Sequence, residues 1–94
     1  MKHAALVHER EDDVAVVIRD VSPGTKILTV DMEGREVITV DAAEEIPLGH
    51  KIALRSLKKG EKIKKYGRSI GKATQDIKQG AHVHVQNIKS ERWS

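Results

Sequence analysis

The sequence predicts an all-β fold made of short strands, and three observations carry this prediction. Val and Ile dominate the apolar positions, helical periodicity is weak, and Gly or Pro interrupts the chain at short intervals. The 94 residues suit one small domain, which we place at residues 1–94. Its core must come from Val, Ile and Leu because Phe is absent, and we expect at most one or two short helical turns.

In the first half of the chain, the expected strands are residues 4–8, 14–20, 26–31 and 35–41. The acidic run 9–13 is the expected turn between the first two. Ser22-Pro23-Gly24-Thr25 suits a type II turn, because Pro fixes φ at the first central position and Gly accepts a positive φ at the second. Residues 26–41 then predict a hairpin around Gly34, and residues 42–45 a single helical turn or a loop.

One short pattern recurs along the chain: an apolar residue, two others, Gly, two others and a second apolar residue. It occurs at residues 21–27, 57–63 and 77–83. The first apolar residue can close a strand or short helical turn, Gly makes a tight bend, and the last apolar residue opens the next strand. The spacing is irregular, which indicates a reused turn rather than a solenoid.

The stretch Gly80–Asn87 alternates in polarity and predicts a strand. Its alternation directs His82 and His84 to one face, and Val83 and Val85 to a buried one. Two histidines presented together suit metal, substrate or acid/base contact, because the pKa of histidine lies near neutrality. The same pattern is also typical of an ordinary solvated strand face, and this alternative stays open.

Other polar residues are candidate contacts for an anionic substrate. His50 and Lys51 follow a rigid Pro/Gly turn and could hold a carboxylate, although His50 could equally bond a loop carbonyl. Lys65 precedes Tyr66, which we expect to be partly buried at the edge of the core. Asn87 could contact substrate, but turn formation is the preferred interpretation.

Charge is distributed unevenly along the chain. Residues 1–47 hold 5 Lys/Arg and 11 Asp/Glu, whereas residues 48–94 hold 12 and 3. The basic half suits a small carboxylate or an acidic partner surface. Nucleic acid is disfavoured, because single-strand binders interleave basic residues with stacking aromatics and only Tyr66 is available. The alternative is that these are solvated lysines that protect strand edges.

Composition also excludes some chemistry and suggests a location. Without Cys there is no disulfide, thiolate nucleophile or cysteine-bound zinc. The first residues lack the apolar region of a signal peptide, and no segment approaches the ~20 apolar residues of a membrane span. We therefore expect a cytoplasmic, soluble protein without a membrane partner.

Three blocks together resemble a known family: Pro47–Leu54, Lys65–Thr74 and His82–His84. They are similar to the small subunit, or N-terminal SAF domain, of the altronate/galactarate dehydratase family, which includes sulfolactate sulfo-lyase small subunits. The resemblance covers nearly the whole chain, and residues 1–8 are slightly closer to the sulfo-lyase branch. It implies a β-clip fold and a larger catalytic subunit as partner. Family members commonly carry a third histidine where this chain has Gln86.

The resemblance implies β-elimination from a small hydroxy acid: a proton leaves the carbon next to the carboxylate, and hydroxide leaves the next carbon. In the sulfo-lyase branch, sulfite leaves instead. The chemistry requires a cation for the carboxylate, a Lewis acid or base for the α-proton, and an acid to assist a leaving hydroxide. A divalent metal, iron or manganese, is expected to be held largely by the large subunit.

We therefore expect the small subunit of a sugar-acid hydro-lyase that is inactive alone. The expected catalytic residues are His82 and His84, which could alternatively be metal ligands. The expected substrate contacts are His50, Lys51, Lys65 and Asn87. Two alternatives stay open: a (2R)-sulfolactate sulfo-lyase subunit, and a non-catalytic SAF module that binds anionic sugars or a partner protein. A homo-oligomer is also left open.

Overall fold

A computed structural model describes residues 2–90 and contains short β-strands with no helix in that range, as the sequence predicts. Within this range, therefore, no helix is long and apolar enough to cross a membrane. The strands are β1 (Ala5–Leu6), β2 (Val14–Val17), β3 (Lys26–Val30), β4 (Glu36–Asp41), β5 (Lys51–Ala53), β6 (Lys62–Lys65), β7 (Arg68–Ala73), β8 (His82–Val83) and β9 (Ile88–Ser90).

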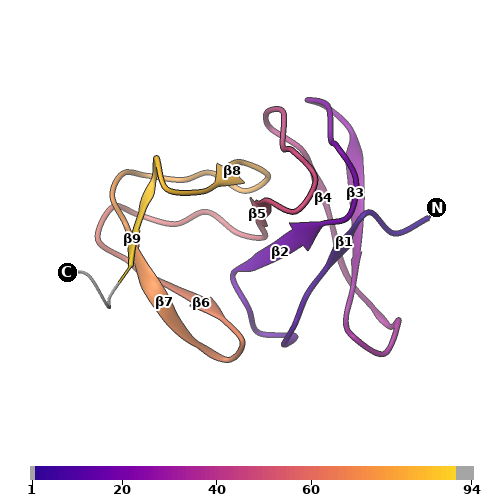
Figure 1. Cartoon of the computed structure of the whole chain (residues 1–94), viewed down its shortest axis with the longest axis horizontal. Coiled ribbons are helices and arrows are strands. Elements are labelled where there is room, and N and C mark those ends of the chain that lie inside the picture. Colours follow the sequence, from indigo (N-terminus) through magenta and orange to yellow (C-terminus); the bar gives the residue numbers. More distant parts are fainter. Residues whose placement is uncertain (1, 91–94) are drawn as a thin grey trace.

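The strands form two sheets that lie side by side (Figure 1). One sheet has six strands in the order β4-β3-β1-β2-β5-β8, and the other has three in the order β6-β7-β9. The β1–β3 pair is parallel, and every other named pair is antiparallel. The short strands and curled sheets agree with the mainly β, SAF-type β-clip expected from the sequence.

The described residues form two apolar clusters, the second of which combines side chains from both sheets, and β2 and β5 contribute to both clusters. Ile52 packs in the first cluster and its neighbour Ala53 in the second, and in β2 Ala15 and Val14 divide in the same way. Successive strand residues point to opposite faces, so one strand pair can support two cores. The pairing of β2 with β5 also places Lys51 opposite Val16.

The glycine turn occurs four times, not three. The fourth copy is Ile46–Ile52, and the copies associate in pairs through the bridges Val21↔Ile46 and Leu57↔Ile77. All four glycines have a positive φ, between 84° and 87°. The turn at Ser22–Thr25 also forms as expected, with the Thr25 N–H donating to the Ser22 carbonyl at 3.2 Å.

Two local expectations are decided by the structure. Residues 42–45, expected as a helical turn or a loop, form bends, so the loop alternative is correct. They are held open by long-range backbone bonds, in which the Ala42 N–H donates to Thr25 and the Ala43 N–H to Gly80. The strand expected at residues 14–20 ends at Val17, because the chain turns toward the bridge at Val21.

Candidate functional site formed by three histidines

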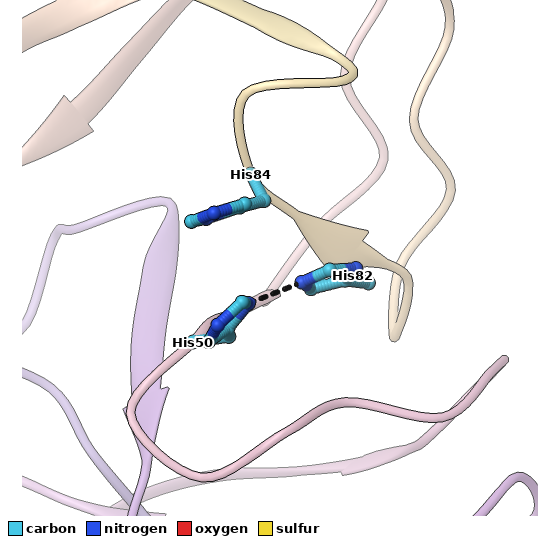
Figure 2. Close-up of side chains that lie close together, drawn as sticks. All are labelled: His50, His82 and His84. Atoms are coloured by element: carbon cyan, nitrogen blue, oxygen red, sulfur yellow. Dashed lines mark hydrogen bonds between the residues drawn. The ribbon is translucent and has the colours of Figure 1, made fainter.

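Three imidazoles from two segments of the chain converge on one half-buried spot: His50, His82 and His84 (Figure 2). One nitrogen from each ring lies within 4.8 Å of the others. The closest pair is His50 Nδ1 and His82 Nε2, at 2.8 Å. The His50 and His84 rings stack with their centroids 4.2 Å apart.

Strand register brings these histidines together. β5 pairs with β8 so that Ile52 faces His82 and Lys51 faces Val83. Continuing this antiparallel register by one step sets His50 opposite His84, where side chains on the same face approach closely. His82 and His84 share a face as predicted, with ring centroids 5.6 Å apart.

The strand that carries the pair is shorter than expected, and Asn87 explains why. The Asn87 side chain donates to the His82 carbonyl at 2.7 Å and accepts from the His84 N–H at 2.9 Å. These bonds engage backbone groups that a longer strand would need for its ladder. The chain therefore bends after Val83, and Val85, expected to be buried, is 79% exposed.

The surroundings of His82 favour its neutral form. Burial lowers its pKa, the adjacent His50 lowers it further, the Glu44 carboxylate raises it, and His84 again lowers it. Glu44 also accepts the backbone N–H of His82 at 3.0 Å. A neutral imidazole can accept a proton or bind a metal ion near neutral pH. Glu44 was not foreseen, since nothing local in the sequence links it to a strand 38 residues away.

Gln86 contacts the site from its edge. Its Nε2 lies 3.3 Å from His82 Nδ1. Gln86, at the position where members of the family that the chain resembles commonly carry a third histidine, therefore contacts the His82 ring. The third imidazole of the cluster comes from His50, which the sequence assigned to substrate and not to metal.

The other predicted substrate contacts are placed differently. Asn87 is buried and bonded within the turn. Lys51 lies on β5 beside His50 in sequence and is half-buried. Lys65 is buried on β6, in the other sheet, with its Nζ 3.5 Å from the centroid of the Tyr66 ring.

Tyr66 itself is 51% exposed, so the prediction that it is partly buried at the core edge is wrong. It lies at the tip of the β6–β7 hairpin, where its ring meets His8 edge to face with centroids 4.3 Å apart. The Lys65 ammonium lowers the pKa of the phenol. The Asp12 carboxylate accepts the backbone N–H groups of Tyr66 and Gly67 at this tip, both at 3.0 Å.

The donor set of the three histidines fits a transition-metal ion. Imidazole nitrogen suits zinc, iron, nickel and copper, whereas manganese prefers oxygen ligands. Of the two metals that the family resemblance implies, iron therefore matches these side chains better than manganese. His50, His82 and His84 are the residues that would hold it.

Comparison with known proteins places the chain in a family. Residues 3–91 match the family model of the altronate/galactarate dehydratase SAF domain. The chain is 38% identical over 89 residues to the (2R)-sulfolactate sulfo-lyase subunit alpha of Chromohalobacter salexigens, covering 94% of this chain and 95% of that protein.

Two further relatives represent both branches. The (2R)-sulfolactate sulfo-lyase subunit alpha of Paracoccus pantotrophus is 48% identical over 52 residues, covering 55% of this chain and 78% of that protein. The altronate dehydratase of Bacillus subtilis is 37% identical over 90 residues, which is 96% of this chain but 17% of the much longer enzyme. The chain therefore belongs to the altronate/galactarate dehydratase SAF domain family, whose members include parts of lyases.

Proposed function

We propose that this chain is the SAF component of a lyase for small hydroxy acids and contributes its three histidines to a site shared with a larger catalytic chain. The observation that carries the proposal is the convergence of His50, His82 and His84 within 4.8 Å. Its relatives are named as altronate dehydratase and as a subunit of (2R)-sulfolactate sulfo-lyase. The match covers 17% of the dehydratase, so most of that enzyme lies outside it.

The cluster is accessible to a second chain. β8 is the outermost strand of the six-stranded sheet, and its turn carries the exposed Val85. Leu48, two residues before His50, is 60% exposed. Apolar side chains beside half-buried histidines suit a surface that is covered when the catalytic chain docks.

Elimination from a hydroxy acid requires a base for the α-proton and an acid for the leaving group. The lowered pKa of His82 favours its neutral form, which can accept the α-proton. In the alternative role, the same imidazole and that of His50, 2.8 Å away, bind a metal ion instead. Lys51, which the sequence suggested as a cation for the carboxylate, follows His50 directly and therefore points to the other face of β5, on the side of Tyr66. A divalent ion, when bound, would act as a Lewis acid on the substrate carboxylate.

Two leaving groups are compatible with these parts. The first candidate is hydroxide, in a dehydratase for altronate- or galactarate-type sugar acids. The second is sulfite, released from sulfolactate, and it is favoured by the 48% identity to the Paracoccus pantotrophus subunit. The three histidines can serve either reaction, because removal of the α-proton is common to both.

The test is reconstitution with the larger catalytic chain that the proposal requires. Dehydration of altronate and galactarate, and sulfite release from sulfolactate, are measured with the wild-type chain, His82→Ala and His84→Ala. Loss of acid/base catalysis lowers kcat by about 10²–10⁴-fold. His3→Ala is the matched control, because His3 is exposed and outside the cluster.

Each outcome has a clear meaning. If His82→Ala and His84→Ala both assemble with the catalytic chain and keep full activity, the two histidines have no catalytic role. That result would favour a non-catalytic binding module. If neither reaction occurs although the two chains assemble, the substrate class is wrong.

A further inference from the structure

We infer that His50, His82 and His84 form a complete metal site within this chain, which binds one divalent transition-metal ion without the catalytic chain, and that Gln86 orients His82 in it. The inference deepens the proposed function, because it assigns a ligand to the same cluster. It differs from the sequence-based expectation, in which the ion is held largely by the large subunit.

The first argument is distance. Nitrogen ligands about 2.0–2.1 Å from one ion lie roughly 3–3.5 Å from one another. Here His50 Nδ1 and His82 Nε2 are 2.8 Å apart, and all three donor atoms lie within 4.8 Å. The rings are stacked, so the inference requires side-chain rotations that turn the three nitrogens toward one point.

The second argument is that the backbone beneath the cluster is held in place. The His82 N–H donates to Glu44, and the Asn87 side chain bonds both the His82 carbonyl and the His84 N–H. His50 lies in a turn where the Gly49 N–H donates to Val17 and the His50 N–H to Pro47. A site whose ligands are already positioned loses less conformational entropy when the ion binds.

The third argument concerns the ring orientation of His82. A histidine that binds a metal through one nitrogen usually donates its other N–H to an oxygen partner, which sets the tautomer. Gln86 lies 3.3 Å from His82 Nδ1, and His82 Nε2 faces His50. A half-turn of the Gln86 amide exchanges its nitrogen and oxygen. The amide oxygen then accepts from Nδ1–H and leaves Nε2 free to bind the ion.

The donor set identifies the class of ligand. Three imidazoles select ions such as Zn²⁺, Fe²⁺ and Co²⁺ over Mg²⁺ and Ca²⁺, which prefer oxygen. Three protein ligands also leave a coordination position for water or a substrate oxygen, as in catalytic metal sites. Gln86 is therefore a positioning residue, and the three histidines are the ligands.

The experiment uses the purified 94-residue chain, stripped of metal with a chelator. Zn²⁺ binding is measured by titration calorimetry and Co²⁺ binding by visible absorption. All titrations use a His3→Ala background, because a histidine near a free amino terminus can bind ions by itself. We expect one ion per chain, no measurable uptake of Mg²⁺, and loss of that ion in His50→Ala, His82→Ala and His84→Ala.

Gln86 is tested separately. Gln86→Ala should weaken Zn²⁺ binding by about 10–100-fold and shift the Co²⁺ spectrum, as loss of an orienting partner does. Gln86→Glu should restore binding, because a carboxylate also accepts the Nδ1–H. Gln79→Ala is the matched control, since Gln79 bonds the Leu54 carbonyl and touches no histidine.

Absence of stoichiometric Zn²⁺ binding overturns the inference, as does binding that persists in His50→Ala. Circular dichroism of each metal-free variant shows whether lost binding reflects unfolding, and Gln at the same position replaces any histidine-to-alanine variant that unfolds. If the chain binds Zn²⁺ but the histidine variants leave lyase activity intact, the proposed function fails and the metal site stands. If no ion binds but His82→Ala abolishes activity, the reverse holds.

Discussion

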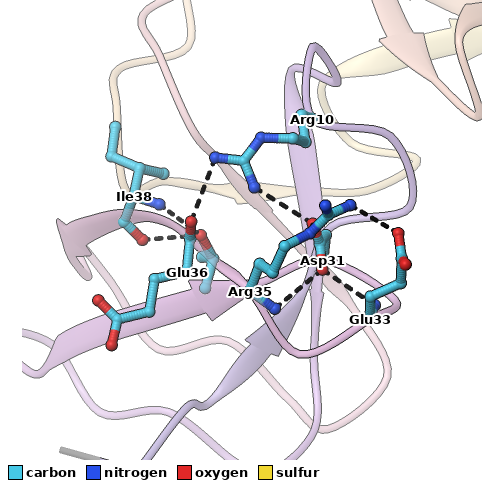
Figure 3. Close-up of polar contacts among 7 residues, drawn as sticks. Arg10, Asp31, Glu33, Arg35, Glu36 and Ile38 are labelled. Atoms are coloured by element: carbon cyan, nitrogen blue, oxygen red, sulfur yellow. Dashed lines mark hydrogen bonds and ion pairs between the residues drawn. The ribbon is translucent and has the colours of Figure 1, made fainter.

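At the residue scale, single carboxylates hold much of this structure together, and Asp31 is the clearest case (Figure 3). Its Oδ1 accepts the backbone N–H groups of Glu33 and Arg35, and its Oδ2 meets the guanidinium groups of Arg35 and Arg10. Burial by itself would raise the pKa of Asp31, but the hydrogen bonds outweigh it and lower the pKa to about 2. The side chain is 6% exposed.

This lowered pKa predicts a specific acid sensitivity. The pKa of Asp31 is about 2 in the folded chain and about 3.9 in the unfolded one. The charged carboxylate therefore stabilises the fold above the unfolded value, and this stabilisation is lost as the pH falls through the folded value. Asp31→Asn should lower stability at pH 7 and remove this pH dependence.

Urea unfolding followed by circular dichroism at several pH values between 7 and 2 measures the effect. The difference between wild type and Asp31→Asn should shrink as the pH falls through the interval between those two values. Asp41→Asn is the control, because its ion pair with Lys26 is exposed on both sides and should matter little. A constant difference between wild type and Asp31→Asn at all pH values would contradict the assignment.

The histidine cluster shows what a sequence can predict at this scale. His82 and His84 could be paired from their spacing alone, because alternation along a strand is local. The role of His50 could not, since its position depends on the β5–β8 register across 32 residues. Val85 was misplaced because a single buried side chain, Asn87, ends the strand before it.

At the scale of elements, the repeated glycine turn carries the architecture. Three copies could be read from the sequence, and their role as bends between strands is confirmed. Their pairing, Val21 with Ile46 and Leu57 with Ile77, is long-range and has no local signature. The copy at Ile46–Ile52 was missed, although it positions His50.

The four turn glycines are not equivalent, which predicts different costs for the same substitution. Gly60 has φ 86° and open space where a Cβ would lie, whereas a Cβ on Gly80 would overlap the Asp41 carbonyl. Gly60→Ala should cost about 1–2 kcal/mol, the cost of the left-handed conformation. Gly80→Ala adds a backbone clash and should cost about 3 kcal/mol or more.

Chemical denaturation of both variants measures these costs, and Gly60→Ala serves as the matched control for Gly80→Ala. The Gly80 variant should also disturb the histidine ring signals in NMR spectra, since His82 is two residues away. Equal costs for the two variants would show that the contact between Gly80 and residues 41–43 is not tight. The Ala43 N–H to Gly80 carbonyl bond, at 2.8 Å, is the interaction at risk.

The β6–β7 hairpin contains a residue that its turn does not favour. Tyr66 has φ 57° and Gly67 has φ 72°. Two consecutive positive φ values indicate a type I′ turn, for which Asn-Gly is preferred. Tyr66→Asn should therefore stabilise the hairpin by up to about 1 kcal/mol, because Asn tolerates the left-handed region better.

Loss of the contacts of Tyr66 with His8 and Lys65 works against this gain. Tyr66→Ala separates the two effects, since Ala loses the same contacts without tolerating the conformation. Thermal unfolding should rank Asn above Tyr and Tyr above Ala. If Asn and Ala are equally destabilised, the ring contacts outweigh the backbone strain.

At the scale of the whole molecule, the acidic first half of the chain meets the basic second half through a few buried contacts. Asp13 accepts the Lys64 N–H and the Arg55 guanidinium, and its own N–H donates to the Lys64 carbonyl. Asp12 accepts the N–H groups of Tyr66 and Gly67. The acidic run 9–13, predicted from the sequence to be a turn, therefore also connects the three-stranded sheet to the six-stranded one.

Six exposed basic residues lie on and around the β6–β7 hairpin: Lys58, Lys59, Lys62, Lys64, Arg68 and Lys72. Their place on one hairpin is compatible with the predicted acidic partner or carboxylate, which stays a prediction. Sequence analysis could locate this surface because charge density is local. It could not separate the buried Lys65 from its exposed neighbours.

The shared strands and the aspartate contacts predict that both cores unfold in one transition, as expected of a single domain. Ile27 belongs to the first core and Ile63 to the second, and both are fully buried. Ile27→Ala and Ile63→Ala should each cost about 2–5 kcal/mol, a large share of the roughly 5–15 kcal/mol of a small domain. Each variant should lower the stability of both sheets equally, because β2 and β5 cannot lose one core and keep the other.

Hydrogen exchange of the amides of Val30 and Ala73 reports on the two sheets separately. If Ile63→Ala accelerates exchange at Ala73 and leaves Val30 protected, the sheets are independent units, and the link through the two aspartates is weaker than their contacts indicate.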